Sequence, residues 1–180
     1  RKRRRTVAPL KPHGLPVLNE EKALLLLAYN RPDSFKQVID GVREAAPPRI
    51  YVSVDGPKSE GDARRIDQVI QNLSHIDWDC DLRVQRYKAN HGCRRAVAAG
   101  VSWFFQNESE GIILEDDVVP TREFFDFCTT MLNRYREDER VAMVSGISRV
   151  PPHFQGGDYG YRFTRFAHIW GWATWRRTWS

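Results

Sequence analysis

The period of the apolar residues changes regularly along this 180-residue chain, and that alternation constrains the fold more than any other feature. Short apolar stretches of strand length alternate with segments in which apolar residues recur every three or four positions, as on one face of a helix. The apolar stretches predict strands over 22–29, 49–56, 111–115 and 141–146, and 82–87 predicts a shorter strand with alternating apolar residues. The segments between them predict helices over 34–45, 60–73, 92–106 and 121–138.

Strands and helices that alternate at this spacing form βαβ units, so the predicted fold class is α/β, with a mostly parallel sheet and helices on both faces. Asp33 or Ser34 is placed to cap the first helix. Sheets of this kind bind ligands in the crevice at the carboxyl ends of their strands. The candidate site residues are therefore those at the strand ends: Tyr29, Asn30, Arg31, Asp55, Gly56, 87–92 and 115–117.

Positive charge is concentrated at the N-terminus. The net charge is +5, and "RKRRRT" alone supplies five positive charges, so the rest of the chain is close to neutral and does not resemble a nucleic-acid-binding protein. Residues 1–20 are predicted to form a flexible basic tail, either solvated or in contact with an anionic membrane surface, and 21–180 a single domain. No apolar run has the length of a membrane span, and no signal-peptide pattern is present.

The cysteine and histidine patterns argue against several kinds of site. Cys80, Cys93 and Cys128 are odd in number and lack CxxC spacing, which favours buried thiols in a reducing cytoplasm over a disulfide framework. The histidines have no paired metal-ligand spacing, so a zinc site is not predicted. GxSxG, GxGxxG and GxxxxGK[ST] do not occur, which argues against an α/β-hydrolase, a dinucleotide enzyme and a P-loop ATPase.

Three consecutive carboxylates, Glu115, Asp116 and Asp117, close the apolar strand "GIIL". Clustered acids repel one another, and without a counter-charge their pKa values rise. Mg²⁺ and Mn²⁺ prefer oxygen ligands and often take one or two carboxylates together with water and substrate phosphate. A solvated loop that helps to cap the next helix is the alternative. The position after a buried strand, with Arg31 and Asp55 after two other strands, favours a metal-bound diphosphate.

Four segments, "LLLLAYNRPDSFKQVI", "VSVDGP", "ILEDDVVPTREFFDF" and "WGWATWRRTW", together resemble nucleotide-sugar glycosyltransferases of the GT-A fold. The similarity is greatest to bacterial family 2-like transferases and the N-acetylglucosaminyltransferase I group, and it runs from 22 to 180. "LEDD" is similar to the DxD metal motif of that group. The resemblance implies metal-dependent transfer of a sugar from a UDP-linked donor to an acceptor hydroxyl, with inversion.

The resemblance also implies a role for each charged candidate. Asp117 would be the direct ligand of Mn²⁺ or Mg²⁺, Asp116 would lie near the ribose, and Glu115 near the donor sugar. Arg31 would contact the diphosphate. Asp55 would recognise the uracil, although Asp-Gly is equally a turn signal.

The remaining donor contacts implied by the resemblance are Ala28, Tyr29 and Asn30, which would line the nucleotide, and Arg94 or Arg95 at a helix start. The catalytic base of the resembled group follows the WGW segment, so here it would lie beyond Ser180. Asp158 precedes that segment and is a poor match. The domain 21–180 would then be truncated in its acceptor region.

The aromatic C-terminal segment has two interpretations. Trp172, Trp175 and Trp179 recur at helical spacing, which predicts a helix stripe that faces the core. Alternatively, Trp170 and Trp172 on either side of Gly171 would wall a sugar. If a C-terminal region follows, some of these rings would be exposed without it.

Two other functions compete with the glycosyltransferase. A sugar-nucleotide pyrophosphorylase would keep the fold, but that class has a Gly-rich, Arg-containing loop after the first strand, and "AYNRPDS" has only the arginine. A truncated domain that binds nucleotide sugar without turnover is the non-enzymatic alternative. The expected partners are a nucleotide-sugar donor and a glycan, lipid-linked or protein acceptor, and the expected location is cytoplasmic, peripheral to the membrane if the tail contacts it. The fold does not encode the donor sugar or the acceptor.

Overall fold

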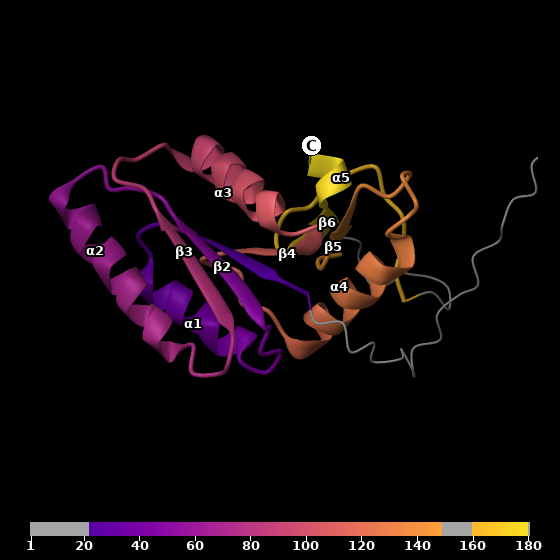
Figure 1. Ribbon diagram of the computed structural model, residues 1–180, viewed down its shortest axis with the longest axis horizontal. Coiled ribbons are helices and arrows are strands. Elements are labelled where there is room, and N and C mark those ends of the chain that lie inside the picture. The colour runs from indigo at the N-terminus through magenta and orange to yellow at the C-terminus, as the bar shows by residue number, and fades with distance from the viewer. Residues whose placement is uncertain (1–21, 149–159, 180) are drawn as a thin grey trace, which may run out of the picture.

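The computed structural model describes residues 22–148 and 160–179. Within this part of the chain, the strands form a six-stranded sheet in the order β3-β2-β1-β4-β6-β5 (Figure 1). They are β1 (Leu24–Ala28), β2 (Arg49–Val54), β3 (Asp81–Arg86), β4 (Glu110–Glu115), β5 (Met143–Ser145) and β6 (Trp172–Trp175). β3, β2, β1 and β4 pair in parallel, and β6 runs antiparallel between β4 and β5. The prediction of a mostly parallel sheet is confirmed.

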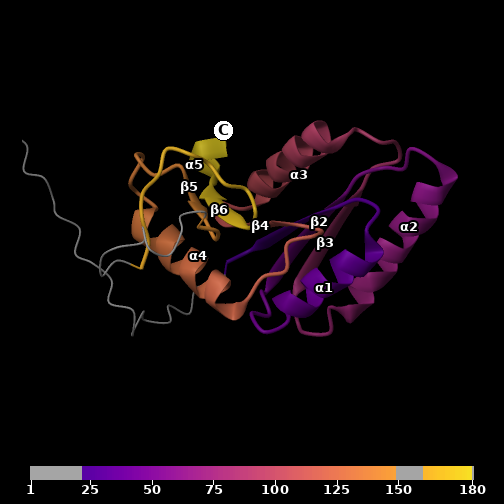
Figure 2. The same ribbon diagram turned by 180° about the vertical axis from the view of Figure 1, so that it is seen from behind.

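Helices cover both faces of this sheet, as predicted. They are α1 (Pro32–Val42), α2 (Glu60–Gln71), the 3₁₀ turn η1 (Asn72–His75), α3 (Cys93–Asn107), α4 (Arg122–Tyr135) and the short α5 (Arg176–Trp179). α1, α2 and α4 pack on one face and α3 on the other, and the two opposite views agree (Figures 1 and 2). Among the described residues, no helix combines the length and the apolar character that crossing a membrane requires.

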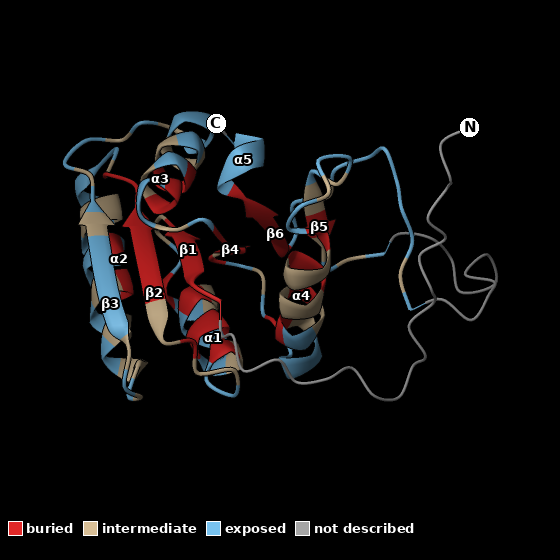
Figure 3. Ribbon diagram, turned by 45° about the vertical axis from the view of Figure 1, so that its right-hand side comes forward, coloured by how far each residue is buried: buried red, intermediate tan, exposed pale blue. Residues whose placement is uncertain are grey.

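β1 lies in the middle of the core, which explains its uninterrupted apolar sequence. Leu24 and Leu26 join the cluster under α1, α2 and α4, whereas Leu25 and Leu27 join the cluster under α3. All four side chains are buried, and β1 and β4 lie among the red, buried elements at the centre of Figure 3. A strand covered on both faces has no polar face to alternate with. Because each fully buried leucine contributes about 1.5–3 kcal/mol, this strand anchors the loop that follows it.

The first helix begins earlier than the sequence predicts. α1 starts at Pro32 with Arg31 as its N-cap residue, and no side chain caps it. The prediction that Asp33 or Ser34 caps the helix is therefore wrong. Proline suits the first helical position because it has no N–H to leave unpaired and its φ is already helical. The early start places Arg31 at the junction of strand end and helix.

The helical interpretation of the tryptophans is also wrong. Trp172 and Trp175 lie in β6, where Trp172 pairs with Ile113 of β4 and Trp175 with Glu110. Residues three apart in a strand point to opposite faces. Accordingly, Trp172 packs in the α3-side cluster and Trp175 in the cluster on the other face, where its Nε1 donates to the carbonyl of Leu132 at 3.2 Å.

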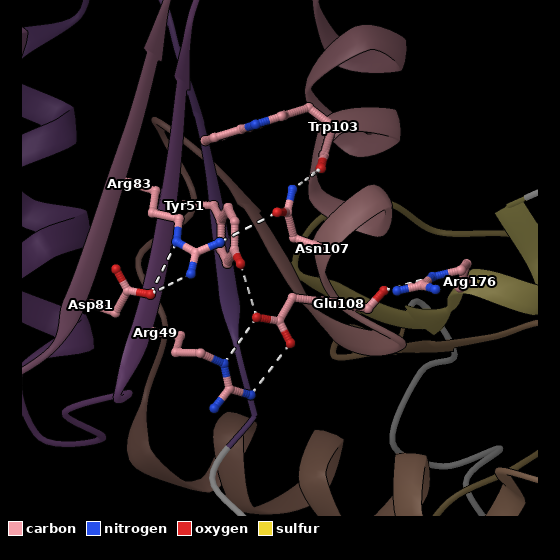
Figure 4. A network of polar contacts seen from close by, with 8 residues as sticks. All are labelled: Arg49, Tyr51, Asp81, Arg83, Trp103, Asn107, Glu108 and Arg176. Atoms are coloured by element: carbon pink, nitrogen blue, oxygen red, sulfur yellow. Dashed lines mark hydrogen bonds and ion pairs between the residues drawn. The ribbon is translucent and has the colours of Figure 1, made fainter.

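A polar network lies at the end of the sheet where the parallel strands begin (Figure 4). The carboxylate of Glu108, at the end of α3, accepts hydrogen bonds from Nε of Arg49 at 2.9 Å and from the hydroxyl of Tyr51 at 3.0 Å. Arg83 lies over the Tyr51 ring, 5.3 Å from its centroid, and Nε of Arg176 donates to the carbonyl of Glu108. These contacts fix the end of α3 far from the strand ends that carry the candidate site.

Candidate functional site

The candidate site lies where the strand order reverses. From β1 the chain continues to β2 and β3 on one side, and then crosses to β4 on the other side. β1 and β4 are direct neighbours, with Leu27 opposite Glu115, so the segments that follow them emerge side by side. Crevices at such reversal points are where open α/β sheets bind their ligands.

Arg31 joins the two acids that follow β4. Its Nη1 lies 3.2 Å from Oδ1 of Asp116 and 2.5 Å from Oδ2 of Asp117. Asp116 is buried, and its Oδ2 also accepts the backbone N–H of Tyr29 at 3.0 Å. Asp117 differs because half of its side chain is exposed. The structure therefore brings Arg31 against Asp116 and Asp117, which lie more than 80 positions later in the sequence.

Two of the acids after β4, Glu115 and Asp116, have raised pKa values. Burial raises the pKa of Glu115, and the charges of Asp117 and Asp116 raise it further. Burial also raises the pKa of Asp116, although the Tyr29 N–H and Arg31 partly offset this effect. The single guanidinium of Arg31 does not balance the three carboxylates at the end of β4. A bound cation would balance the remaining negative charge.

The side chains present fit a divalent cation held mainly by a ligand rather than by a protein cage. Within residues 22–148 and 160–179, no group of three or more histidine, cysteine, aspartate or glutamate side chains is placed to hold a metal ion. Mg²⁺ and Mn²⁺ often bind through one or two carboxylates while water and substrate phosphate complete the octahedron. The half-exposed Asp117 meets that requirement, and the buried Asp116 beside it adds charge.

Asp55 organises a neighbouring loop. Its Oδ1 accepts the backbone N–H groups of Gly56 and His91 at 2.8 and 2.9 Å. Its Oδ2 accepts the side-chain amide of Asn90 at 2.9 Å and the backbone N–H of Gly92 at 3.2 Å. A carboxylate offers about four acceptor positions, and all four are occupied here. The role of Asp55 as the uracil acid stays a prediction, and in this conformation a nucleobase would have to displace one of these donors.

Gly56→Ala is expected to disturb this loop. A Cβ at Gly56 would lie 2.3 Å from the carbonyl carbon and oxygen of Ala89, and backbone atoms cannot move aside cheaply. We expect a loss of about 1–3 kcal/mol in the free energy of unfolding, measured by urea denaturation. Gly61→Ala is the matched control, because its Cβ meets nothing nearer than Oγ of Ser59 at 3.6 Å. Equal stability of the two variants would contradict the close packing of these loops.

Three other residues that the resemblance predicts to contact the nucleotide sugar take no part in the contacts among Arg31, Asp116 and Asp117. The side chain of Ala28 packs in the core, and its carbonyl accepts the N–H of Asp55, so it can meet a ligand only through its backbone. Arg94 and Arg95 are exposed in the first turn of α3, and neither makes an ion pair with a described residue. Cys93, beside them, is also exposed, contrary to the expectation of buried thiols.

Asp62 is a residue of the site that the sequence patterns do not indicate. Its carboxylate accepts the hydroxyl of Tyr29 at 3.0 Å and the amide of Asn30 at 2.5 Å, so it contacts two of the predicted donor residues. The available signal was the helix start "SEGD", in which Oγ of Ser59 accepts the N–H of Asp62. That pattern predicts a helix N-terminus but not the partner across 33 positions.

The tryptophans separate into two groups near the site. Trp172 is buried in β6 and cannot wall a sugar, whereas Trp170 is 58% exposed just before the strand. Gly171 lies against Leu114 of β4, which places Trp170 close to the acid end of that strand. Asp158, the weak candidate for the base, falls outside the described residues.

Comparison with known proteins supports the architecture. A solved structure that matches is the mannosyltransferase PcManGT from Pyrobaculum calidifontis in complex with GDP-Man and Mn²⁺, with a TM-score of 0.50 and 16% sequence identity. The fold is glycosyltransferase-like. The aligned region covers 79% of this chain and 38% of the mannosyltransferase, so this chain spans well under half of that protein. The likeness does not single out the family 2-like or N-acetylglucosaminyltransferase I group.

Comparisons of the amino-acid sequence found no related protein. No family model matches the chain. No curated protein matches it either.

Proposed function

We propose that this chain belongs to an enzyme that transfers a sugar from a nucleoside-diphosphate donor to an acceptor hydroxyl. The observation that carries the proposal is the cluster of Arg31, Asp116 and Asp117 at the strand-order reversal of a glycosyltransferase fold. Guanidinium groups bind phosphate oxygens, and carboxylates bind the divalent cations that accompany diphosphates. Both groups converge at the crevice where this kind of sheet binds ligands.

In this proposal Asp117 holds Mn²⁺ or Mg²⁺, which would supply positive charge beside the donor diphosphate. Asp116 stays buried and keeps Arg31 and the Tyr29 N–H in place. Arg31 keeps its contact with Asp116, turns from Asp117 to the diphosphate and stabilises the negative charge that develops on the leaving nucleoside diphosphate. The half-buried Glu115 would lie near the donor sugar, as the sequence resemblance implies. Inversion at the anomeric carbon, with a carboxylate base that follows the tryptophan segment, completes the proposed mechanism.

The nucleobase is part of the test. The sequence resemblance implies a UDP-linked donor, whereas the matching mannosyltransferase structure contains GDP-Man. We expect thermal unfolding in a panel of GDP, UDP, ADP, GDP-Man and UDP-sugars to show stabilisation that requires Mn²⁺ and disappears with EDTA. The nucleotide with the largest shift identifies the donor class. The absence of a shift with every nucleotide would overturn the donor-site proposal.

A further inference from the structure

Asp62 connects the segment after β1 with the segment after β2. It lies in the first turn of α2, and its Oδ2 accepts the hydroxyl of Tyr29 at 3.0 Å and the backbone N–H of Lys58 at 3.2 Å. Its Oδ1 accepts the side-chain amide of Asn30 at 2.5 Å. These donors, that of Asn30 first, lower the pKa of Asp62, so the group is ionised near neutral pH.

Tyr29 is hydrogen-bonded through both its backbone and its side chain. Its backbone N–H donates to Oδ2 of Asp116, and its hydroxyl donates to Asp62. Its ring packs on the core under α1 and α2, and Nζ of Lys58 lies 5.9 Å from the ring centroid. One residue therefore links the acid end of the candidate site to the start of α2.

Asn30 is fixed in the same way. Its side-chain amide donates to Asp62, and its carbonyl accepts Nε of Arg65 at 2.9 Å, one turn further along α2. The segment 29–31 is thus fastened to α2 on one side and to the end of β4 on the other. A side chain that is already oriented loses less conformational entropy when a ligand binds.

We propose that Asp62 is a positioning residue for the nucleoside part of the donor, acting through Tyr29 and Asn30. The inference rests on the proposed function. Asp62 itself is turned toward these two side chains and the Lys58 N–H, so its effect passes through their orientation. The diphosphate, by contrast, would be held by Arg31 and by the cation at Asp117, and among the described residues Asp62 forms no hydrogen bond or ion pair with Arg31 or Asp117.

The test compares a ligand that has a nucleoside with one that lacks it. Calorimetric titration in Mn²⁺ with GDP, with UDP and with inorganic pyrophosphate is carried out on the wild type and on Asp62→Ala. We expect the variant to bind the preferred nucleotide about tenfold more weakly, because two side chains lose their orientation. Pyrophosphate affinity is expected to change less than about twofold, since its contacts are intact.

A double-mutant cycle separates positioning from general loosening. If Asp62 acts through the tyrosine, Tyr29→Phe weakens nucleotide binding, and adding Tyr29→Phe to Asp62→Ala costs little more, because interacting residues are not additive. Ser59→Ala is the matched control: it removes the Ser59 hydroxyl from the Asp62 N–H and carboxylate but keeps the bonds of Asp62 to Tyr29 and Asn30. This control is expected to lower the melting temperature without changing nucleotide affinity.

Several results would overturn the inference. An equal loss for pyrophosphate and nucleotide, additive effects of the two substitutions, or a loss in Ser59→Ala as large as in Asp62→Ala would each show a merely structural role. Should Asp62→Ala not fold, Asp62→Asn retains one acceptor oxygen and must give a smaller loss of the same kind. A wild type that binds no nucleotide would overturn the proposed function as well, whereas nucleotide binding that Asp62→Ala leaves intact would overturn only the positioning role.

Discussion

Asp117→Ala is expected to abolish the Mn²⁺-dependent stabilisation of this protein by a nucleoside diphosphate. Ligand at 100 times its dissociation constant stabilises a folded protein by about 2.7 kcal/mol. In a domain of this size that corresponds to a rise of about 5–10 °C in melting temperature. The alanine variant should show almost none of this rise, because Asp117 is the half-exposed carboxylate available to a cation. Thermal unfolding with and without Mn²⁺ measures the difference.

Two comparisons make this result specific. Asp126→Ala removes an exposed acid that pairs with Arg122 on α4, and it is expected to keep the full shift. Without ligand, Asp117→Ala should unfold close to the wild-type temperature, because loss of the exposed ion pair with Arg31 and relief of the repulsion with Glu115 and Asp116 act in opposite directions. Equal ligand-induced shifts in the wild type and in Asp117→Ala would remove the metal assignment.

The regular elements could be predicted because each leaves a local pattern. The apolar run of β1 indicates a strand that is buried on both faces. In α1 the helical spacing indicates one buried face, formed by Phe35, Val38, Ile39 and Val42. Once strands and helices alternate, the carboxyl ends of the strands follow as a class of positions. Arg31 and the acids at 115–117 were selected on this basis, and the structure places Arg31 against two of them.

The C-terminal strand could not be predicted in the same way. Trp172 and Trp175 are buried on opposite faces of β6, which gives a spacing of three that imitates a helix. A four-residue strand between β4 and β5 is too short for its period to be distinguished from that of a helix. Its pairing with β4, some 60 positions earlier, is a tertiary contact, and no local pattern encodes it.

The hydrogen-bond partners of individual side chains could not be predicted from the sequence either. Asp55 was identified as a site residue from its position after a strand, and the same position is what brings four donors of the loop 90–92 and Gly56 to its carboxylate. Asp62 was not identified at all, because the start of α2 indicates a cap and gives no information on the orientation of Tyr29. Which acid binds a ligand and which acid binds its own chain depends on distances that only the folded chain provides.

Glu110→Ala is expected to cause a large loss of stability. Glu110 and Lys22 are both buried, with Nζ of Lys22 2.7 Å from Oε1 of Glu110. Arg136 adds a bidentate contact through Nη2 at 2.8 Å and Nε at 3.0 Å. Loss of one partner of a buried ion pair costs about 3–5 kcal/mol. Urea denaturation measures this, and Asp40→Ala, which breaks only the exposed pair with Lys36, should cost no more than about 0.5 kcal/mol.

The pH dependence of stability tests the same ion pair independently. Burial alone would raise the pKa of Glu110, but the contacts with Arg136 and Lys22 outweigh it, so the pKa in the folded protein is lowered. A lowered carboxyl pKa contributes stability above the unfolded value of about 4.3, and this contribution is lost as the pH falls through the folded value. The raised pKa values of Glu115 and Asp116 act in the opposite direction, so only the difference between the wild type and Glu110→Gln isolates the effect. That difference in the free energy of unfolding should be largest at pH 6 and shrink toward pH 3. A difference that is constant with pH would mean that Glu110 stabilises the fold through packing and hydrogen bonding rather than as an ionised partner.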